Sequence, residues 1–583
     1  MFRFMKSIPR YMQGMQTQNF QRNLSTMHQY VEHNFKWKLI CLGAFSSGLY
    51  IFFGINHCHT AEKKKKVVLL GSGWAAVNFI RNLKPELYEL SVVSPANYFL
   101  FTPLLPSVTV GTVEIRSVVE PIRNLIHKKH KNTVYFYEGE CVDVDIDNQK
   151  VICKDNSAIM GSKSEYTLDY DILIVGIGAD NATFNIPGVR EHCHFLKSVE
   201  DACKLRNTVM DCFETAAIPN QPQEEIERLL HFVVVGAGPT GVEFAAELRD
   251  LVREDLKHLY PNLIDYCKVT LVEALPQILN AYDESIKEYT TNHFKKDGIN
   301  IWTKHMVTKV EKNCVTVKKM ETKEIIEVPF GTCVWSTGIA PQELTKKIMK
   351  KIPGQTNRHA LLTDNFLQVK NSNGHIFAMG DCSTIELKKL LSNIKEIFFE
   401  ADKDNDGKLS LKEFKDAMEK AKYAYPQICK HFSADDWDNT LLRAFKEADE
   451  NADGSLGIEE FQNILKIVDN KLTSLPCTAQ VASQKGKYLG ILFSDHVDDI
   501  GETSDLSKVG ADEFEYNHMG MFAYIGDDRA VLQFPVIGSF KGLGAMYLWK
   551  AAYFNESVTV RTKCLILFDW IKSRLFGRDT SRI

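Results

Sequence analysis

Two glycine-rich turns in this chain have the composition of phosphate-binding loops. The first, Gly71–Ala76, follows the apolar run 67–70, and the second, Gly236–Gly241, follows the apolar run 232–235. Glycine lets the backbone turn tightly and approach a pyrophosphate, whose charge then lies against the amide groups that open the next helix. A single turn of this kind is often only a strand-to-helix connection. Two of them, each directly after a strand-like run, predict two dinucleotide sites in one chain.

An acidic residue after the second turn indicates which nucleotide binds there. Glu273 closes the strand-like run 269–272. A carboxylate at this place accepts hydrogen bonds from a ribose 2′-hydroxyl and repels a 2′-phosphate. The alternative is an ordinary exposed carboxylate at a strand end. We expect NADH rather than NADPH at this second site.

The first site lacks such an acid. The matching run 90–93 is followed by Ser94, so Ser94 or Asn97 would have to replace the carboxylate. This departure weakens a plain NAD interpretation and favours FAD, which buries more of its surface elsewhere. Asp381, after Met379 and Gly380, is then the candidate that binds the ribityl or phosphate region of the flavin, because its carboxylate accepts hydroxyl protons.

Between residues 386 and 470 the sequence becomes charged and helix-periodic, and it contains two loops typical of EF-hands. Oxygen ligands stand at alternate positions, a glycine allows the sharp turn at position 6, and a glutamate closes each loop at position 12. The first loop offers Asp402, Asp404, Asp406, Ser410 and Glu413, and the backbone carbonyl of Lys408. The second loop offers Asp449, Asn451, Asp453 and Glu460, and the carbonyl of Ser455, with Gly457 at position 9. An acidic solvated loop is the alternative, but so many matched positions in both loops predict Ca²⁺ sites.

Composition places the chain among folded globular proteins. Its 583 residues are 44% hydrophobic and 25% charged, which suggests about three or four domain-sized units. The net charge of -4 is close to balanced, so no nucleic-acid partner is implied. The 14 cysteines form no C-x-x-C pair, which argues against a disulfide scaffold, a zinc ribbon or a local redox disulfide.

Strand-like and helical runs alternate from residue 65 onward, which predicts an α/β fold class. We expect two Rossmann-like doubly wound domains, the second inserted in the first, with an all-α EF-hand pair and a C-terminal amphipathic membrane-binding helix region. The predicted segments are 65–228, 339–386 and 471–538 for the FAD-binding domain and the quinone site, 229–338 for the NADH-binding domain, 387–470 for the EF-hand pair, and 539–583 for membrane association.

The composition of the first residues predicts targeting segments. Residues 1–38 begin with a basic stretch that has no acidic residue and many hydroxyl and amide side chains, which is typical of a mitochondrial transit peptide; a disordered basic tail is the alternative. Residues 39–55 are uncharged and mostly apolar, with lysines on both sides. We expect a membrane anchor there, although the run is slightly short for a full span.

Near the other end, the sequence predicts a basic amphipathic helix. Apolar residues alternate with cationic ones between Val558 and Leu575, and Trp570 lies among them. A helix of this kind suits the membrane interface, where a lipid-soluble quinone is collected. The competing interpretation is a helix that packs on the protein's own core or on a second subunit.

Taken together, these residues resemble the type II NADH:quinone oxidoreductases of respiratory membranes, and among them the mitochondrial external kind that carries EF-hands. The similarity extends over residues 65–583. It rests on the segments Val68–Ala76, Asn97–Ser107, Val234–Glu243, Trp335–Gly338, Ala378–Asp381 and Thr478–Gln484, with the EF-hand insertion between the last two.

The resemblance implies which residues hold the cofactors. FAD would lie on Gly71, Gly73, Ala75 and Asp381, and NADH on Gly236, Gly238, Gly241, Glu273 and Gly338. Quinone would approach past Ala479, Gln480 and Gln484. Some relatives have a histidine where this chain has Ser483, so no proton-donating role is assigned at that position.

The resemblance also implies the reaction and its setting. Hydride would pass from NADH to FAD, and two electrons would then pass to ubiquinone, with no side chain assigned as an obligate acid or base and no proton pumping. The expected partners are ubiquinone, inner-membrane lipid, calcium and a second copy in a homodimer. We expect the intermembrane-space face of the mitochondrial inner membrane, with the matrix face as the alternative, and a response of the activity to calcium.

Two other functions compete with this one. A sulfide:quinone or disulfide-type reductase on the same fold would need a redox cysteine pair at the flavin, for which Cys141, Cys153, Cys314 and Cys333 are candidates without supporting spacing. A non-catalytic calcium-sensing membrane scaffold would have vestigial nucleotide sites, but the glycines of both turns are intact.

Overall fold

The computed structural model describes residues 64–129, 133–159, 161–386, 390–424, 428, 437–471, 475–535 and 537–582. The predicted transit segment 1–38 and the predicted anchor 39–55 lie outside these residues. Among the described helices, none combines the length and the apolar character that crossing a bilayer requires.

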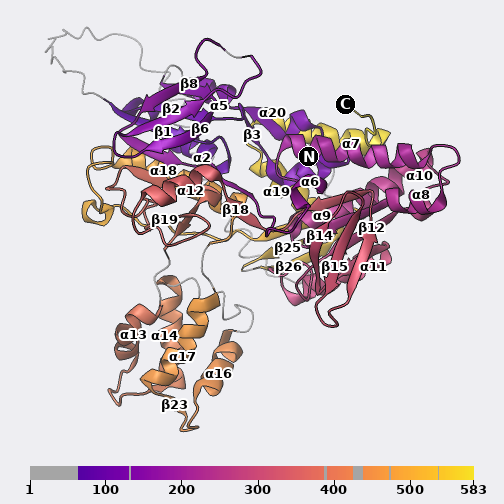
Figure 1. Ribbon diagram of the computed structural model, residues 1–583. Coiled ribbons are helices and arrows are strands. Elements are labelled where there is room, and N and C mark those ends of the chain that lie inside the picture. Colours follow the sequence, from indigo (N-terminus) through magenta and orange to yellow (C-terminus); the bar gives the residue numbers. More distant parts are fainter. Residues whose placement is uncertain are drawn as a thin grey trace, which may run out of the picture. The chain divides into compact units, whose positions relative to one another are not determined.

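The first domain is built on a five-stranded parallel sheet (Figure 1). Its strands are β1 (Lys65–Leu70), β2 (Tyr88–Ser94), β5 (Val134–Glu138), β9 (Ile172–Val175) and β20 (Ile376–Ala378), in the order β20-β9-β1-β2-β5. The central strands β1 and β9 are apolar on both faces because helices cover parallel sheets from both sides. Helix α2 (Trp74–Asn82) follows the first glycine turn.

The second domain repeats this arrangement with four parallel strands. They are β11 (His231–Val235), β12 (Lys268–Val272), β13 (Ile299–Trp302) and β17 (Thr332–Trp335), in the order β13-β12-β11-β17. Helix α9 (Pro239–Leu251) follows the second glycine turn. Because β20 returns to the first sheet after all of these strands, the strands of the second sheet lie, in sequence, between those of the first.

Each domain also carries a three-stranded antiparallel sheet. In the first domain this sheet contains β6 (Glu140–Asp145), β7 (Lys150–Lys154) and β8 (Glu165–Asp169). In the second it contains β14 (His305–Val310), β15 (Cys314–Lys319) and β16 (Ile325–Pro329). Helix α7 (Val199–Ala216) leads from the first domain into the second and begins with a capping box formed by Ser198 and Asp201.

A short ribbon joins the carboxyl ends of the two parallel sheets. Strand β9 continues into β10 (Ala179–Asn181), strand β17 continues into β18 (Ile339–Pro341), and β10 pairs with β18 in antiparallel orientation. Nucleotides bind at the carboxyl ends of the strands in sheets of this kind. The ribbon therefore brings the binding edges of the two domains together.

The insertion forms a small helical unit with its own hydrophobic core. Its helices are α13 (Ile394–Ala401), α14 (Leu411–Ala424), α16 (Trp437–Ala448) and α17 (Ile458–Lys471), and the short strands β22 (Leu409–Ser410) and β23 (Ser455–Leu456) pair between the two loops. Phe398, Phe414 and Phe461 are fully buried at its centre. The predicted all-α pair is confirmed, with the strand pair as an addition.

After the insertion, helix α18 (Ala479–Asp495) packs closely on α2. A Cβ at Gly486 would lie 2.0 Å from the carbonyl oxygen of Ala75, and one at Gly490 would lie 2.8 Å from that of Phe79. The two glycines thus allow the helix backbones to approach each other. The chain then forms the antiparallel strands β24 (Met521–Gly526), β25 (Arg529–Phe534) and β26 (Gly538–Gly542), followed by α19 (Leu543–Glu556) and α20 (Val560–Phe576).

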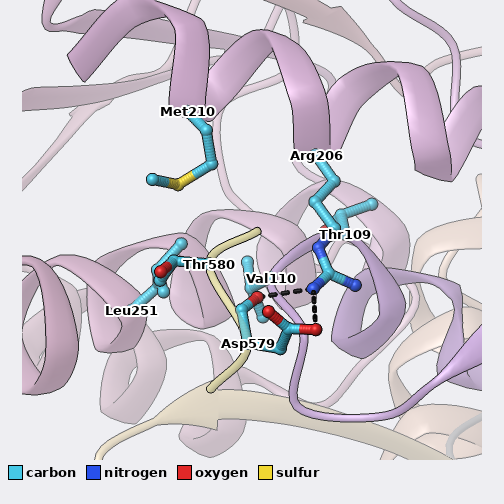
Figure 2. A pocket seen from close by; sticks show the side chains of 7 residues that line it. All are labelled: Thr109, Val110, Arg206, Met210, Leu251, Asp579 and Thr580. Atoms are coloured by element: carbon cyan, nitrogen blue, oxygen red, sulfur yellow. Dashed lines mark hydrogen bonds and ion pairs between the residues drawn. The ribbon is translucent and has the colours of Figure 1, made fainter. Parts of the chain in front are cut away.

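The residues after α20 contact both domains. Arg206 of α7 donates a hydrogen bond to the carbonyl oxygen of Asp579 at 2.5 Å and pairs with its carboxylate at 3.4 Å (Figure 2). Arg578 pairs with Asp255, just beyond α9, at 2.8 Å and donates to Thr112 at 3.0 Å. These contacts fix the end of α20 to the first domain and to α9.

Candidate functional site

The glycines of the first turn fall into two physical classes. Gly71 has φ +108°, and a Cβ there would lie 2.3 Å from the carbonyl oxygen of Gly176, so the fold itself requires glycine. Gly73 has φ -80°, and a Cβ there would meet no protein atom within 4 Å. Neither the backbone nor the packing requires glycine at this position. The free space lies at the N terminus of α2, where a pyrophosphate fits.

The second turn repeats this division. Gly236 has φ +100°, and a Cβ at Gly241 would lie 2.0 Å from the carbonyl oxygen of Gly236. Gly238, by contrast, has φ -72° and open space around its missing side chain. Both turns therefore combine glycines that shape the backbone with one glycine that leaves room at a helix N terminus. The chain fits one dinucleotide in each turn.

Glu273 lies where the ribose of the second nucleotide is expected. One oxygen of its carboxylate accepts a hydrogen bond from the amide of Ala237 in the glycine turn at 2.7 Å, and the other accepts from the amide of Leu275 at 2.9 Å. Gly338 lies at the start of the ribbon with φ +77°, and a Cβ there would lie 2.5 Å from the ring of Phe184. The structure thus brings Glu273 to the turn and gives Gly338 a role in the ribbon.

At the first turn, the structure corrects one expectation about the missing acid. The hydroxyl of Ser94 is buried and donates to the hydroxyl of Ser72 at 2.8 Å, so Ser94 is not the replacement. Asn97 donates to the carboxylate of Glu138 at 3.2 Å. Glu138 ends β5, in register with Ser94 of β2. An acid is therefore present at this edge, but it comes from the neighbouring strand.

Ala75 is placed differently from the glycines beside it. It is buried, and its carbonyl oxygen is the atom against which Gly486 of α18 packs. Its small side chain therefore serves the contact between α2 and α18. Binding of FAD at Ala75, as for the other predicted site residues, stays a prediction.

Asp381 lies between two lysines that sequence reasoning missed. Burial raises the pKa of Asp381, while the cations of Lys197 and Lys485 lower it. Lys485 of α18 is buried and donates to the hydroxyl and the carbonyl oxygen of Ser383 at 2.9 Å and 3.0 Å. Burial lowers the pKa of Lys485 to about 8. Only the tertiary structure singles out these two lysines among the many in the chain.

The predicted quinone-site residues face a loop at residues 516–520. Gln480 accepts hydrogen bonds from the hydroxyl of Tyr516 at 2.7 Å and from the amide of Met519 at 3.0 Å. Gln484, one turn further along α18, exchanges two hydrogen bonds with the backbone of Asn517, at 2.7 Å and 2.9 Å. The structure thus places both glutamines on one face of α18, each in contact with the same loop.

Helix α9 carries three buried acids, two of which contact β24. Glu243 accepts from the amide of Tyr524 at 3.0 Å, Asp250 accepts from the hydroxyl of Tyr524 at 2.5 Å, and Glu247 accepts from the hydroxyl of Ser107 at 2.5 Å. Burial raises the pKa of Glu243 to about 8 and that of Asp250 to about 7. Sequence periodicity puts them on one face of a helix, but it does not reveal that this face is buried.

The raised pKa of Glu243 predicts a pH-dependent stability. An unfolded glutamate loses its proton near pH 4.5, whereas the folded Glu243 keeps it up to about pH 8, so stability falls as pH rises between these values. We expect Glu243→Gln to weaken this fall and to raise the Tm of the holoenzyme at pH 9. Thermal unfolding from pH 5 to 9 checks this, with the exposed Glu89→Gln as the control. Parallel Tm curves for both variants and the unaltered protein would contradict it.

The four cysteines proposed for the rival reductase do not gather at one place. Cys141 and Cys153 face each other across β6 and β7 in the first domain. Cys314 lies on β15 and Cys333 on β17, both in the second domain, and the sulfur of Cys333 is 3.5 Å from that of Cys193. The four are thus divided between the two domains. Cys141 and Cys153 are adjacent, but they lie on the antiparallel sheet of the first domain and not on the β10–β18 ribbon between the two nucleotide-binding sheets.

The first EF-hand loop has the geometry of a cation site. Carboxylate oxygens of Asp402, Asp404 and Glu413 lie within 4.8 Å of one another. The amides of Asp406 and Gly407 donate to Asp402 at 3.1 Å and 2.9 Å, as expected for a loop that turns its carboxylates inward. In the second loop, Asp449 accepts from the amides of Asp453 and Gly454 in the same way. The donor set of hard oxygens fits calcium.

A contact between the loops gives Lys408 a role beyond its backbone carbonyl. Its ammonium group pairs with Asp453, a predicted ligand of the second loop, at 2.6 Å. Calcium at the second loop must therefore compete with this lysine. We expect Lys408→Gln to increase the calcium affinity of the second loop several-fold, which calorimetric titration of the whole protein measures. Lys420→Gln, on the exposed part of α14, is the control; equal affinities in both variants would contradict the competition.

The C-terminal helices bury both apolar and polar side chains: α19 buries Ala545, Met546 and Trp549. In α20, Thr562, Ile566 and Asp569 are buried, and Asp569 accepts from the amide of Glu114 at 3.0 Å. Nine large apolar side chains of the two helices are exposed. They are Leu543, Tyr547 and Leu548 of α19 and Val560, Leu567, Phe568, Ile571, Leu575 and Phe576 of α20. The predicted helix is confirmed, and its exposed surface combines these apolar side chains with Arg561 and Arg574.

Comparisons with known proteins agree with this geometry. The sequence profile of the pyridine nucleotide-disulphide oxidoreductases matches residues 65–414, that of the NDH2 C-terminal domain matches residues 518–579, and that of the EF hand matches residues 442–465. The external alternative NAD(P)H-ubiquinone oxidoreductase B1 of Solanum tuberosum is 41% identical over 572 residues, which are 94% of this chain and 98% of that protein. The chain belongs to the family of external alternative NAD(P)H-ubiquinone oxidoreductases.

Other members of the family of external alternative NAD(P)H-ubiquinone oxidoreductases are also similar. The enzyme of Yarrowia lipolytica is 35% identical over 566 residues, covering 94% of this chain and 87% of that one. The solved structure of NDH2 from Plasmodium falciparum in complex with NADH has a TM-score of 0.75 and 30% identity, covering 89% of this chain and 100% of that one. The chain is thus a mitochondrial, FAD-dependent oxidoreductase, as predicted, and the reductase and scaffold alternatives lose their support.

Proposed function

We propose that this chain is a calcium-responsive NADH:ubiquinone oxidoreductase that works through FAD without pumping protons. The observation that carries the proposal is the β10–β18 ribbon, which joins the carboxyl ends of the two nucleotide-binding sheets. A nicotinamide on the second domain can then meet a flavin on the first. The family's printed names, which include ubiquinone, support the acceptor.

Different residues bind the two nucleotides. Gly71, Gly73 and Asp381 hold FAD, and Gly236, Gly238 and Gly241 hold NADH. Bound at these residues, the flavin would supply the chemistry of accepting a hydride from NADH and of passing two electrons to a quinone. Glu273 orients the ribose and disfavours a 2′-phosphate. Lys197 and Lys485 keep the neighbourhood of Asp381 electropositive, which suits the phosphates and the electron-rich reduced ring.

The apolar face of α19 and α20 docks on the lipid of the mitochondrial inner membrane. Phe568, Leu575 and Phe576 are 63%, 68% and 83% exposed, and water is an unfavourable neighbour for such side chains. The competing occupant is the same face of a second copy in a homodimer. Phe568→Asp should weaken flotation of the protein with liposomes of inner-membrane composition; unchanged flotation together with loss of a dimer would assign the face to the homodimer.

Calcium acts through the place where the insertion enters the chain. The insertion begins after β21 (Ser383–Ile385), next to Asp381, and ends before α18, next to Gln480. A change in the EF-hand pair thus reaches both the flavin and the quinone segments through the backbone. A calcium sensor also suits the intermembrane-space face of the inner membrane, which protease treatment of intact mitochondria and mitoplasts tests against the matrix face.

One assay tests the proposed function. The purified holoenzyme is given a ubiquinone analogue with NADH or NADPH, in calcium or in chelator. We expect quinone reduction with NADH to exceed that with NADPH and to change with calcium. Identical rates in calcium and in chelator would contradict the proposed regulation by calcium. Sulfide-dependent quinone reduction, or no reduction by a flavin-loaded protein, would overturn the activity itself.

A further inference from the structure

The side chain of Gln480 is part of a hydrogen-bonded row that leads to the surface. Its amide oxygen accepts from the hydroxyl of Tyr516 at 2.7 Å, and that hydroxyl lies 3.0 Å from Nδ1 of His518. Tyr516 is half-buried, whereas His518 is exposed. Because the tyrosine donates its only proton to Gln480, Nδ1 of His518 must donate to the tyrosine oxygen. The other ring nitrogen, Nε2, is then free to exchange protons with water.

The proposed reaction needs a proton at this place. NADH, a quinone and one proton give NAD⁺ and a quinol, so one proton must come from water in addition to the hydride. Ser483 lies between Gln480 and Gln484 on α18. It offers only a hydroxyl, which is a poor proton donor at neutral pH. A neutral amide such as that of Gln480 binds a carbonyl oxygen but does not release a proton either. Tyr516 and His518 are the titratable groups in this row.

We propose that Tyr516 is the proton donor to the quinone and that His518 returns the proton to it. The proposal rests on the proposed function, with quinone at Gln480. A quinone carbonyl oxygen that enters beside Gln480 replaces the amide oxygen as the acceptor of the Tyr516 hydroxyl. As two electrons arrive, the tyrosine O–H bond breaks and a quinol O–H bond forms. The proton on Nδ1 of His518 passes to the tyrosine oxygen, and Nε2 takes a proton from water.

The electrostatics of the row agree with this order. Burial raises the pKa of Tyr516 to about 12, and partial desolvation by the surrounding loop lowers the pKa of His518 below its usual value, although its side chain still contacts water. In the described part of the chain, no charged group is among the causes of either shift, and the printed hydrogen bonds of this row join His518 to Tyr516 and Tyr516 to Gln480. The protonated His518 is the better donor, so quinone turnover should fall as pH rises through its lowered pKa.

The test compares two acceptors on the holoenzyme. Ferricyanide takes electrons without protons, whereas a water-soluble ubiquinone analogue takes both. We expect Tyr516→Phe and His518→Gln to lower kcat with the quinone by on the order of tenfold or more, and to leave ferricyanide reduction and the quinone KM within about twofold. In His518→Gln, the fall of quinone turnover as pH rises through the histidine pKa should disappear. Added imidazole should restore part of the quinone turnover of this variant because position 518 is exposed.

Matched controls are an exposed tyrosine and an exposed histidine elsewhere, Tyr135→Phe and His359→Gln, which should behave like the unaltered protein. Equal losses with both acceptors, or loss of FAD from the variants, would show a structural role and overturn the relay. Unchanged quinone turnover and pH profile in both variants would overturn it as well. Failure of the unaltered holoenzyme to reduce quinone would instead overturn the proposed function.

Discussion

Gly73→Val should yield a folded protein without its flavin. The backbone at position 73 is extended with φ -80°, which valine adopts readily, and its Cβ would meet no protein atom within 4 Å. The branched side chain would instead fill the space at the N terminus of α2 in which we place a pyrophosphate. We expect the purified variant to contain less than about a tenth of the unaltered FAD, because a filled phosphate site costs several kcal/mol of binding.

Flavin absorbance and circular dichroism check this result. Gly161→Val is the matched control, since its Cβ would also lie in open space, in a loop far along the chain from the turn. Gly71→Val is a poor probe by comparison, because its Cβ would collide with the carbonyl oxygen of Gly176 whether or not FAD binds. A yellow Gly73→Val protein with one FAD per chain would show that the free space at position 73 is not the flavin's.

The corresponding change in the second turn, Gly238→Val, should abolish NADH oxidation while FAD stays bound. Gly238 has φ -72° and the same open surroundings. Valine there would displace the NADH pyrophosphate from the N terminus of α9. We expect kcat/KM for NADH to fall by at least about a hundredfold, which corresponds to about 2.8 kcal/mol of lost transition-state stabilisation.

Two measurements separate this effect from damage to the fold. Dithionite should still reduce the flavin of Gly238→Val, whereas NADH should no longer bleach it. The pair of variants also tests which nucleotide each turn holds: if the assignment were reversed, Gly238→Val would lose the flavin and Gly73→Val would retain it. Gly161→Val again serves as the control for both.

Short-range features of this protein follow from the sequence because their geometry is set within a few residues. A glycine turn after an apolar run, and a twelve-residue loop with oxygen ligands at alternate positions, have the same local shape wherever they occur. The spacing therefore predicted both nucleotide turns, Glu273 beside the second turn, and both EF-hand loops. The return of the chain to the first sheet also followed, since the strand at 376–378 repeats the apolar pattern of that sheet.

Other features depend on strands, helices and loops that meet only in the folded chain. Glu138 reaches the first turn through the register of β5 with β2, and that register has no local sequence signal. Tyr516 and His518 reach Gln480 from a loop more than thirty residues away in sequence. Burial distinguishes Lys485 from the other lysines and Glu243 from the other glutamates, because desolvation depends on every element packed around a group.

The C-terminal helix combines a feature that the sequence determines with one that only the tertiary structure decides. Its sequence by itself determined a helix with apolar and cationic residues in alternation between residues 558 and 575. Only the tertiary structure decided that Asp569 and Thr562 face the protein while Phe568 and Leu575 face outward. The physical reason is that periodicity fixes which residues share a face, whereas the partners supplied by distant segments, here the amide of Glu114, decide which face is buried.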